Sequence, residues 1–164
     1  MIPAFINALS IFFTRSRLVL EYTPNLYRLA LGILHNREDA EDAVSESVLK
    51  AYEKLHTLRK RECFQAWIMQ IAANEAKRIY AKNKRVSPVE NIEEYMPDFR
   101  DEYHELWDMV MELDIVYREV IILYFYERFS IKEIGEILHI AEGTVKSRLF
   151  RGKKQLREQC EKDF

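Results

Sequence analysis

Apolar residues recur at helical spacing through most of this chain, and few residues interrupt them. Between Leu26 and Leu34 the apolar side chains fall at i, i+3, i+4, i+7 and i+8, which is one face of a helix. The 164 residues include only four glycines and four prolines, the residues that most often break helices. A hydrophobic share of 48% supplies side chains for packed cores. We therefore predict an all-α protein.

Prolines and a run of carboxylates divide the helical pattern into two parts. Periodicity stops at Ser87-Pro88 and again at Pro97, and residues 88–112 hold nine carboxylates against a single arginine. Repulsion among these carboxylates opposes compaction. We expect helices over residues 26–34, 37–58, 63–83, 104–114, 115–127, 130–138 and 142–160. The sequence thus predicts two small helical domains, over residues 1–86 and 104–164, with an acidic linker over residues 87–103.

The net charge of -2 conceals two basic segments. Residues 77–85 contain five basic side chains and no acidic one, and residues 141–157 contain six basic side chains against Glu142 alone. Because salt screens charges beyond about 10 Å, the local charge decides what contacts a phosphate backbone. Both segments are therefore candidates for contact with nucleic acid.

The strongest local pattern lies in residues 130–154 and fits a helix-turn-helix. Ser130 and Glu133 form a capping-box signature at the start of a first helix, whose apolar residues face inward. A tight turn follows at residues 139–141, and a second helix with its own apolar face comes next. We expect Gly135 to lie where the second helix crosses the first closely, because only a tiny side chain fits there.

The outward face of the second helix carries cations, hydroxyls and one aromatic ring. Lys and Arg bind guanine edges or phosphates, Ser bonds to either, and an apolar group contacts a thymine methyl. The alternative is an ordinary basic surface helix, but an exposed Phe150 among cations has no role in a core and favours DNA binding in the major groove. The candidate DNA contacts are Thr144, Lys146, Ser147, Arg148, Phe150, Arg151 and Lys154.

The helix expected over residues 37–58 carries carboxylates opposite its apolar face. This stripe, at spacings of three to four residues, consists of Asp39, Asp42, Glu46, Leu49 and Glu53. Such a stripe is most often only a solvated surface. Leu49 within the stripe nevertheless suggests contact with another protein.

The helix-turn-helix resembles that of bacterial sigma factors. The sequence GTVKSRLFRGKKQL, preceded by SIKEIGEILHI, is similar to the promoter-reading motif of the family and is most like its extracytoplasmic-function (ECF) group. His139 stands for a usual Gly, and Ala141 stands for a usual Ser N-cap whose loss costs about 1 kcal/mol. The resemblance implies that the second domain reads the minus-thirty-five promoter element through the candidate contacts named above.

Two segments of the first domain resemble the same family. DAEDAVSESVLKAYEKL is similar to the helix that docks on the coiled-coil clamp of the beta-prime polymerase subunit, although Ser45 replaces a usual Gln. FQAWIMQIAANEAKRIYAKNKR is similar to the segment that captures and melts the minus-ten element, although Arg78 replaces a usual Asp. By this resemblance, the polymerase-binding residues are Asp39, Asp42, Glu46 and Leu49. The minus-ten contacts are Asn74, Lys77, Arg78, Lys82, Lys84 and Arg85. Trp67 is expected to pack in the core.

The resemblance covers roughly residues 17–157 and implies an alternative sigma factor rather than an enzyme. The implied partners are core RNA polymerase, contacted at the beta-prime clamp and the beta flap, and promoter DNA. An anti-sigma factor is expected to hold the protein inactive until a stress signal arrives. Such a protein is cytoplasmic and associates with the nucleoid when active.

Other functional classes lack their sequence signatures. No Gly-rich phosphate loop, HExxH motif or Cys/His metal spacing occurs, so we expect no cofactor, metal, catalytic residue or small-molecule substrate. Cys63 and Cys160 belong to no CxxC pair and indicate free cytosolic thiols. Residues 1–13 are apolar but fit neither a signal peptide nor a membrane span, and we expect them to form a short helix packed on the first domain.

Two other functions are open at this point. A sigma-like decoy would sequester an anti-sigma factor without binding promoters, but the intact basic recognition helix argues against it. A plain helix-turn-helix repressor or activator would bind duplex DNA as a dimer. Such a regulator needs neither the polymerase-binding segment nor the melting segment of the first domain.

Overall fold

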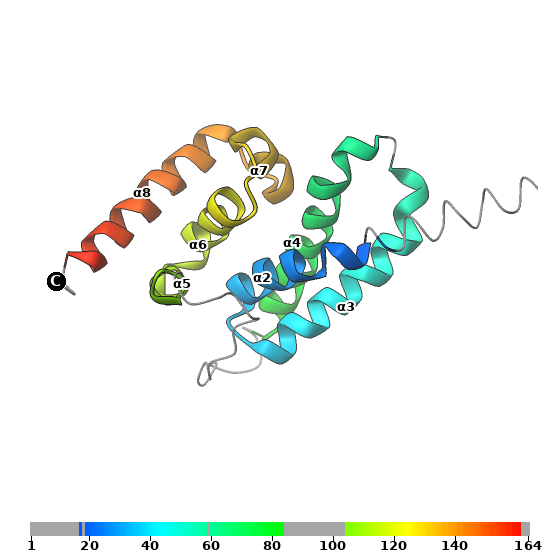
Figure 1. Ribbon diagram of the computed structural model, residues 1–164, viewed down its shortest axis with the longest axis horizontal. Coiled ribbons are helices and arrows are strands. Elements are labelled where there is room, and N and C mark those ends of the chain that lie inside the picture. Colours follow the sequence, from blue (N-terminus) through cyan, green and yellow to red (C-terminus); the bar gives the residue numbers. More distant parts are fainter. Residues whose placement is uncertain (1–16, 18, 59, 84–103, 162–164) are drawn as a thin grey trace, which may run out of the picture.

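The computed structural model describes residues 17, 19–58, 60–83 and 104–161. Within these ranges every secondary-structure element is a helix, which confirms the all-α prediction (Figure 1). The first domain contains α2 (Thr23–Leu34), α3 (Arg37–Lys54), the short 3-10 helices η1 (Leu55–Thr57) and η2 (Arg61–Cys63), and α4 (Phe64–Asn83). The second domain contains α5 (His104–Glu112), α6 (Ile115–Ile121), η3 (Ile122–Tyr126), α7 (Ile131–Leu138) and α8 (Glu142–Cys160). The expected helix over residues 1–13 and the expected linker over residues 87–103 lie outside the described residues.

A sharp turn joins α2 to α3, at the position that the sequence predicted. His35 ends α2 in the left-handed conformation (φ 55°), and its backbone N–H donates to the Leu31 carbonyl. The Asn36 side chain then caps α3 by accepting a hydrogen bond from the Asp39 N–H at 2.9 Å. Because the turn is so short, α2 and α3 pack side by side.

The first domain buries one apolar face of each of its three long helices. Leu26, Leu29 and Ile33 of α2 meet Ile68 and Met69 of α4 in a core that excludes water. Trp67 is partly buried and packs against the core, with its ring centroid 5.9 Å from that of Phe64, in agreement with the prediction that it packs there. A partly buried ion pair between Lys50 and Glu75 also joins α3 to α4.

The helix-turn-helix of α7 and α8 forms as predicted, including its capping box. The Ser130 and Glu133 side chains each bond the backbone N–H of the other residue, at 3.3 and 2.9 Å. His139 takes the left-handed conformation (φ 56°), and Ala141 provides no side-chain cap for α8. At Gly135 a Cβ would lie 2.8 Å from the Ile140 carbonyl oxygen. The turn, rather than the crossing of α8, therefore excludes a larger side chain.

Two predicted helices are shorter in the structure than the apolar pattern suggested. The helix expected over residues 37–58 stops at Lys54 and continues as η1. The helix expected over residues 115–127 stops at Ile121 and widens into the π-helix η3. After η3, Arg128 takes φ 62° and turns the chain towards α7. Apolar periodicity does not distinguish these helix types, because all of them bury one side.

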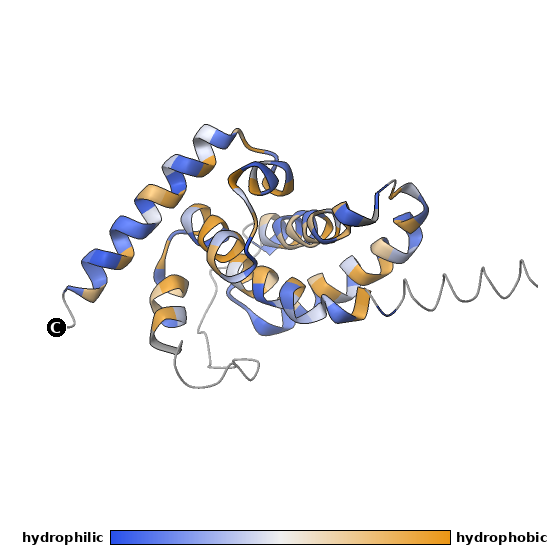
Figure 2. Cartoon of the chain, turned by 45° about the horizontal axis from the view of Figure 1, so that its top comes forward, coloured by the Kyte–Doolittle hydropathy of each residue, from blue (hydrophilic) through white to orange (hydrophobic). Residues whose placement is uncertain are grey.

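The two domains pack directly on each other, a contact that the sequence did not predict. α2 lies against α6 and η3, and α4 lies against α7. In Figure 1, α6 and α7 separate α8 from the first domain. Figure 2 shows that α8 is largely hydrophilic along its length, as expected for a helix with one side on the core and the rest exposed. Among the described helices, none is long and apolar enough to cross a membrane.

Candidate nucleic-acid and partner interfaces

The outer face of α8 presents the predicted DNA contacts to solvent. Val145 and Leu149 are buried behind them and fix the helix on α6 and α7. Phe150 is 69% exposed, so its ring contributes little to the core. The other exposed candidates are Lys146, Ser147, Arg151 and Lys154, and Thr144 is half-buried. This arrangement is a rigid helix with a cationic and aromatic outer face, which suits a DNA groove.

Arg148 differs from the other α8 candidates because it is bound to a buried carboxylate on another helix. Its guanidinium donates to Glu119 Oε1 at 3.0 Å, and only 24% of the side chain is exposed. Glu119 lies on α6 and is almost fully buried. The ion pair therefore sets how α8 sits on α6. Sequence reasoning missed it because the two residues are 29 positions apart on different helices.

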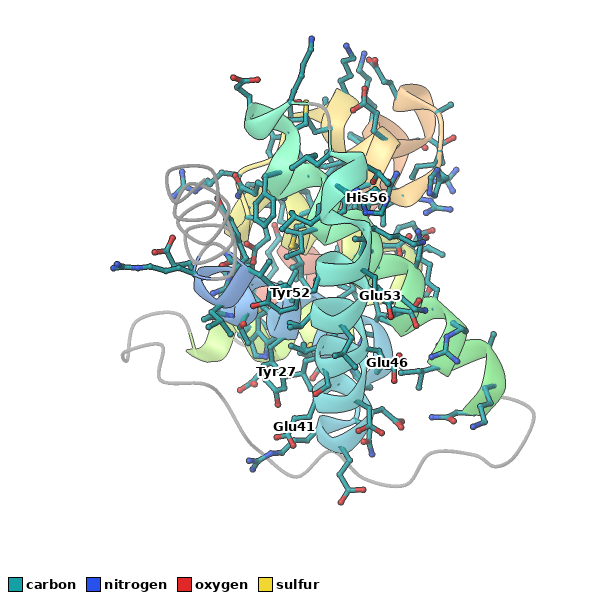
Figure 3. All side chains as sticks on the ribbon, turned by 90° about the vertical axis from the view of Figure 1, so that its right-hand side faces the viewer. Tyr27, Glu41, Glu46, Tyr52, Glu53 and His56 are labelled. Carbon is teal, nitrogen blue, oxygen red and sulfur yellow. The ribbon has the colours of Figure 1, made fainter. Side chains whose placement is uncertain are left out.

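The acidic stripe on α3 has an exposed part and a bound part. Asp42, Glu46 and Leu49 are exposed, with Leu49 at 58%. Figure 3 shows Glu46 and Glu53 projecting from one side of α3, away from Tyr52. Asp39 instead accepts a hydrogen bond from Asn83 Nδ2 at 2.7 Å, which ties the start of α3 to the end of α4.

The cations of α4 are largely engaged in ion pairs. Lys77 Nζ lies 2.9 Å from Glu119 Oε2, so this pair bridges the two domains. Arg78 Nε donates to Glu75 Oε2 at 2.9 Å on the same helix. Asn74 and Lys82 are exposed. The remaining two candidates, Lys84 and Arg85, lie outside the described residues.

Glu75 and His35 are among the groups whose pKa departs from the usual value. Burial raises the pKa of Glu75, but hydrogen bonds from Lys50 and Arg78 outweigh it and leave that pKa below the usual value. Burial, together with the positive charge of Arg118, lowers the pKa of His35 from 6.5 to about 4. Both groups therefore stay in the form that the fold needs at neutral pH. Among the described residues, no group of three His, Cys, Asp or Glu side chains could hold a metal ion.

Comparison with known proteins agrees with this geometry over both domains. The family model described as "Sigma-70 region 2" matches residues 18–86, and "Sigma-70, region 4" matches residues 103–156. RNA polymerase sigma factor SigV of Bacillus subtilis (strain 168) is 34% identical over 149 residues, spanning 88% of this chain and 90% of SigV. The chain belongs to the sigma-70 family. ECF RNA polymerase sigma factor SigW of the same organism is 29% identical over 157 residues, spanning 84% of each chain.

Two solved structures share the fold. The sigma factor RpoE from Bartonella quintana, crystallised with the anti-sigma factor NepR, superposes with a TM-score of 0.79 at 24% identity. The match covers 90% of this chain and 97% of that one. CnrH, solved with the cytosolic domain of CnrY, superposes with a TM-score of 0.66 at 20% identity. This match covers 90% of this chain and 88% of that one.

The chain is therefore an alternative sigma factor of the ECF group. Sigma factors of this family bind core RNA polymerase and promoter DNA and act in transcription initiation, not as catalysts. A plain helix-turn-helix regulator would match only the second domain, so that alternative has no support.

Proposed function

We propose that this sigma factor docks on core RNA polymerase through α3 and reads a two-part promoter with α8 and α4. The observation that carries the proposal is the outer face of α8. There an exposed Phe150 stands among exposed cations on a helix whose other side is fixed in the core. Such a face does not stabilise the folded domain, whereas it is complementary to the major groove of DNA.

Within α8 the candidate residues divide into readers and a positioning residue. Ser147, Phe150 and Arg151 are exposed and are proposed to meet base edges of the minus-thirty-five element. Lys146 and Lys154 are proposed to bind phosphates and to make binding dependent on salt. Arg148, held by Glu119, is proposed to fix the angle of the helix, and Thr144 lies at its start.

Polymerase binding is assigned to the exposed part of the α3 stripe. Asp42 and Glu46 supply charge, and Leu49 supplies an apolar contact that a solvated face would not need. Asp39 is proposed to hold the docking helix in register with α4, because its carboxylate already binds Asn83. The beta-prime clamp is the proposed surface for α3, and the beta flap is proposed to contact the second domain.

Melting of the minus-ten element is assigned to α4 and the residues that follow it. Asn74 and Lys82 are exposed and available for bases and phosphates. Lys77 and Arg78 must leave Glu119 and Glu75 before they bind DNA. The functional boundaries are proposed as residues 1–86, the linker over residues 87–103, and residues 104–164.

An anti-sigma factor is the proposed regulator, because RpoE was solved in complex with an anti-sigma factor and CnrH in complex with the cytosolic domain of CnrY. The protein is proposed to act in the cytoplasm. A sigma-like decoy would share the fold and the anti-sigma partner but would not start transcription.

The test is transcription in vitro from sheared genomic DNA with core polymerase and this protein, with start sites mapped. We expect discrete new starts that share two upstream sequence blocks. Asp42→Arg should abolish these starts by preventing association with the polymerase. No new starts, despite confirmed polymerase binding and an active control sigma factor, would contradict the proposal and favour the decoy.

A further inference from the structure

Three of the described non-glycine residues have a left-handed backbone conformation, and one of them is of an unexpected type. His35 and His139 belong to a residue type that adopts positive φ several times more often than most. Arg128, with φ 62°, does not. A long side chain in this conformation costs free energy that a glycine would not. The sequence therefore keeps an arginine where the backbone favours glycine.

The end of η3 explains why position 128 is left-handed. The Phe129 N–H donates to the Leu123 carbonyl at 3.0 Å, across the end of the helix. This bond closes η3 in the manner of a Schellman cap, one residue wider because η3 is a π-helix. The Phe129 side chain is buried, as is common for the residue after such a cap. The turn thus depends on the backbone at position 128 and not on the arginine side chain.

The Arg128 side chain is exposed and has no partner among the residues that the structure describes. The two carboxylates nearest to it in sequence are bound elsewhere. Glu127 is fully buried in an ion pair with the first domain. Glu133 accepts hydrogen bonds from the hydroxyl and the backbone N–H of Ser130, and these bonds hold the pKa of Glu133 below its usual value. Lys132, also exposed, offsets the charge of Glu133, so Arg128 is a cation that nothing nearby neutralises.

Arg128 lies at the start of the helix-turn-helix. It precedes Ser130, the N-cap of α7, by two residues, and α7 packs against α8 (Figure 1). When the second helix of such a motif occupies the major groove, the first helix crosses the phosphate backbone. An exposed cation directly before α7 therefore lies on the part of the motif that passes along the DNA backbone.

We propose that Arg128 binds a phosphate of the DNA backbone beside the minus-thirty-five element. The proposal rests on the proposed reading of that element by α8. A guanidinium binds a phosphate through two parallel N–H groups, and such a contact fixes the register of a protein on the duplex without reading a base. The contact lies outside α8 and sets where α8 enters the groove. It also accounts for an arginine at a position that favours glycine.

Replacing Arg128 by glycine should change fold stability and DNA binding in opposite directions. Arg128→Gly relieves the left-handed conformation, so the Tm of the full chain should rise by about 2–4 °C. The same change removes one phosphate contact. The full chain should therefore bind a duplex with the mapped upstream block about five- to tenfold more weakly at about 0.1 M salt. The slope of log K against log salt should become shallower by about 0.9.

Three matched variants separate charge, backbone flexibility and net charge. Arg128→Lys keeps both the cation and the strained backbone, so the Tm and the salt slope should stay as in the wild type. Arg128→Asn removes the cation but tolerates the left-handed conformation without the flexibility of glycine, so it should reproduce the shallower slope. Lys54→Asn removes an exposed cation at the end of α3 and should leave the slope unchanged. A scrambled duplex should show the same loss as the upstream block, because phosphates carry no sequence.

Two results would overturn the phosphate contact. One is an unchanged salt slope in both Arg128→Gly and Arg128→Asn. The other is weaker binding to core polymerase with unchanged binding to DNA, because Arg128 would then contact protein. Neither result affects the promoter function, which start-site mapping tests separately. Conversely, a wild type that binds the upstream block no better than the scrambled duplex, with a slope that still falls in these variants, would contradict the reading by α8 and support the phosphate contact.

Discussion

The two helices proposed to contact promoter DNA, α8 and α4, differ in how much of their surface is available. On α8 most candidate contacts point outward, and Arg148, which is bound to a buried carboxylate, is proposed to position the helix. On α4, Lys77 is bound by the second domain, and Arg78 is bound to Glu75. The proposed DNA-binding face of α8 is thus already exposed, whereas that of α4 becomes available only after its ion pairs have broken. We propose that α8 recognises duplex DNA as it stands, whereas α4 binds only after the strands have opened.

Glu119 connects the two helices, so its removal should produce the largest effect. Glu119→Gln leaves Arg148 and Lys77 without their shared counter-charge. Breaking a buried ion pair lowers the free energy of unfolding by about 3–5 kcal/mol. Because both cations are partly exposed, we expect a loss near the lower end, about 3 kcal/mol, for this variant. Urea unfolding measures the loss. Glu158→Gln, which removes the exposed partner of Lys154, is the control and should change the free energy of unfolding by less than about 0.5 kcal/mol. Equal effects of the two variants would refute the bridging role.

Acid should lower the free energy of unfolding through His35, which contacts the second domain through the backbone of Met111. The pKa of His35 is about 4 in the folded chain against 6.5, so the unfolded chain binds more protons in between. Stability is therefore full above about pH 6.5 and falls as the pH drops towards 4. The shift corresponds to about 3 kcal/mol, reduced to about 2 kcal/mol because the side chain is partly exposed.

His35→Asn isolates this contribution, because Asn also tolerates the left-handed backbone conformation. Unfolding free energies of both proteins at pH 7, 5.5 and 4.5 provide the measurement. The wild type should lose more stability on acidification than the variant does. Parallel pH profiles would show that His35 is not the sensitive group, since Glu75 and the other carboxylates titrate in both proteins.

Substitutions on the two DNA helices should differ in character. Arg151→Ala should cost about 1–3 kcal/mol of binding to the cognate upstream element and relax discrimination at one base pair. Lys82→Ala should weaken promoter binding by the polymerase complex uniformly across sequences and reduce the salt slope by about one. Titrations at several salt concentrations distinguish the two. If Arg151→Ala weakened all sequences equally, α8 would not be the reader.

The smallest expected effect concerns the missing cap of α8. Ala141 has an extended N-cap conformation but no side-chain hydrogen bond, so Ala141→Ser should add one. We expect a gain of about 1 kcal/mol in unfolding free energy with unchanged promoter preference. Thermal or urea unfolding measures this gain. A loss of stability would mean that the turn at residues 139–141 does not admit a standard cap.

Local features of this fold could be predicted from sequence, because the residues that make them are neighbours in the chain. The capping box of Ser130 and Glu133 and the end of α2 at His35 are of this kind. The exposed face of α8 followed from the same reasoning. The roles of Arg148 and Lys77 could not be foreseen, because Glu119 lies 29 and 42 positions away on another helix.

The packing of the two domains is harder to predict for a physical reason. Arg28 and Glu127 are 99 positions apart, and each would look like an ordinary surface charge in a helical pattern. Their contact becomes evident only in the structure, where both side chains are buried between α2 and η3. The acidic stretch over residues 88–112 suggested separation, but complementary charges on the domains themselves bring them together.

Binding of promoter DNA with and without the downstream element tests the contrast between α8 and α4 most directly. The free protein and its complex with core polymerase are titrated with duplexes that carry the mapped upstream block alone or both blocks. We predict that the downstream block adds affinity only in the polymerase complex, while the free protein binds both duplexes equally. A free protein that gains as much from the downstream block as the complex does would contradict it.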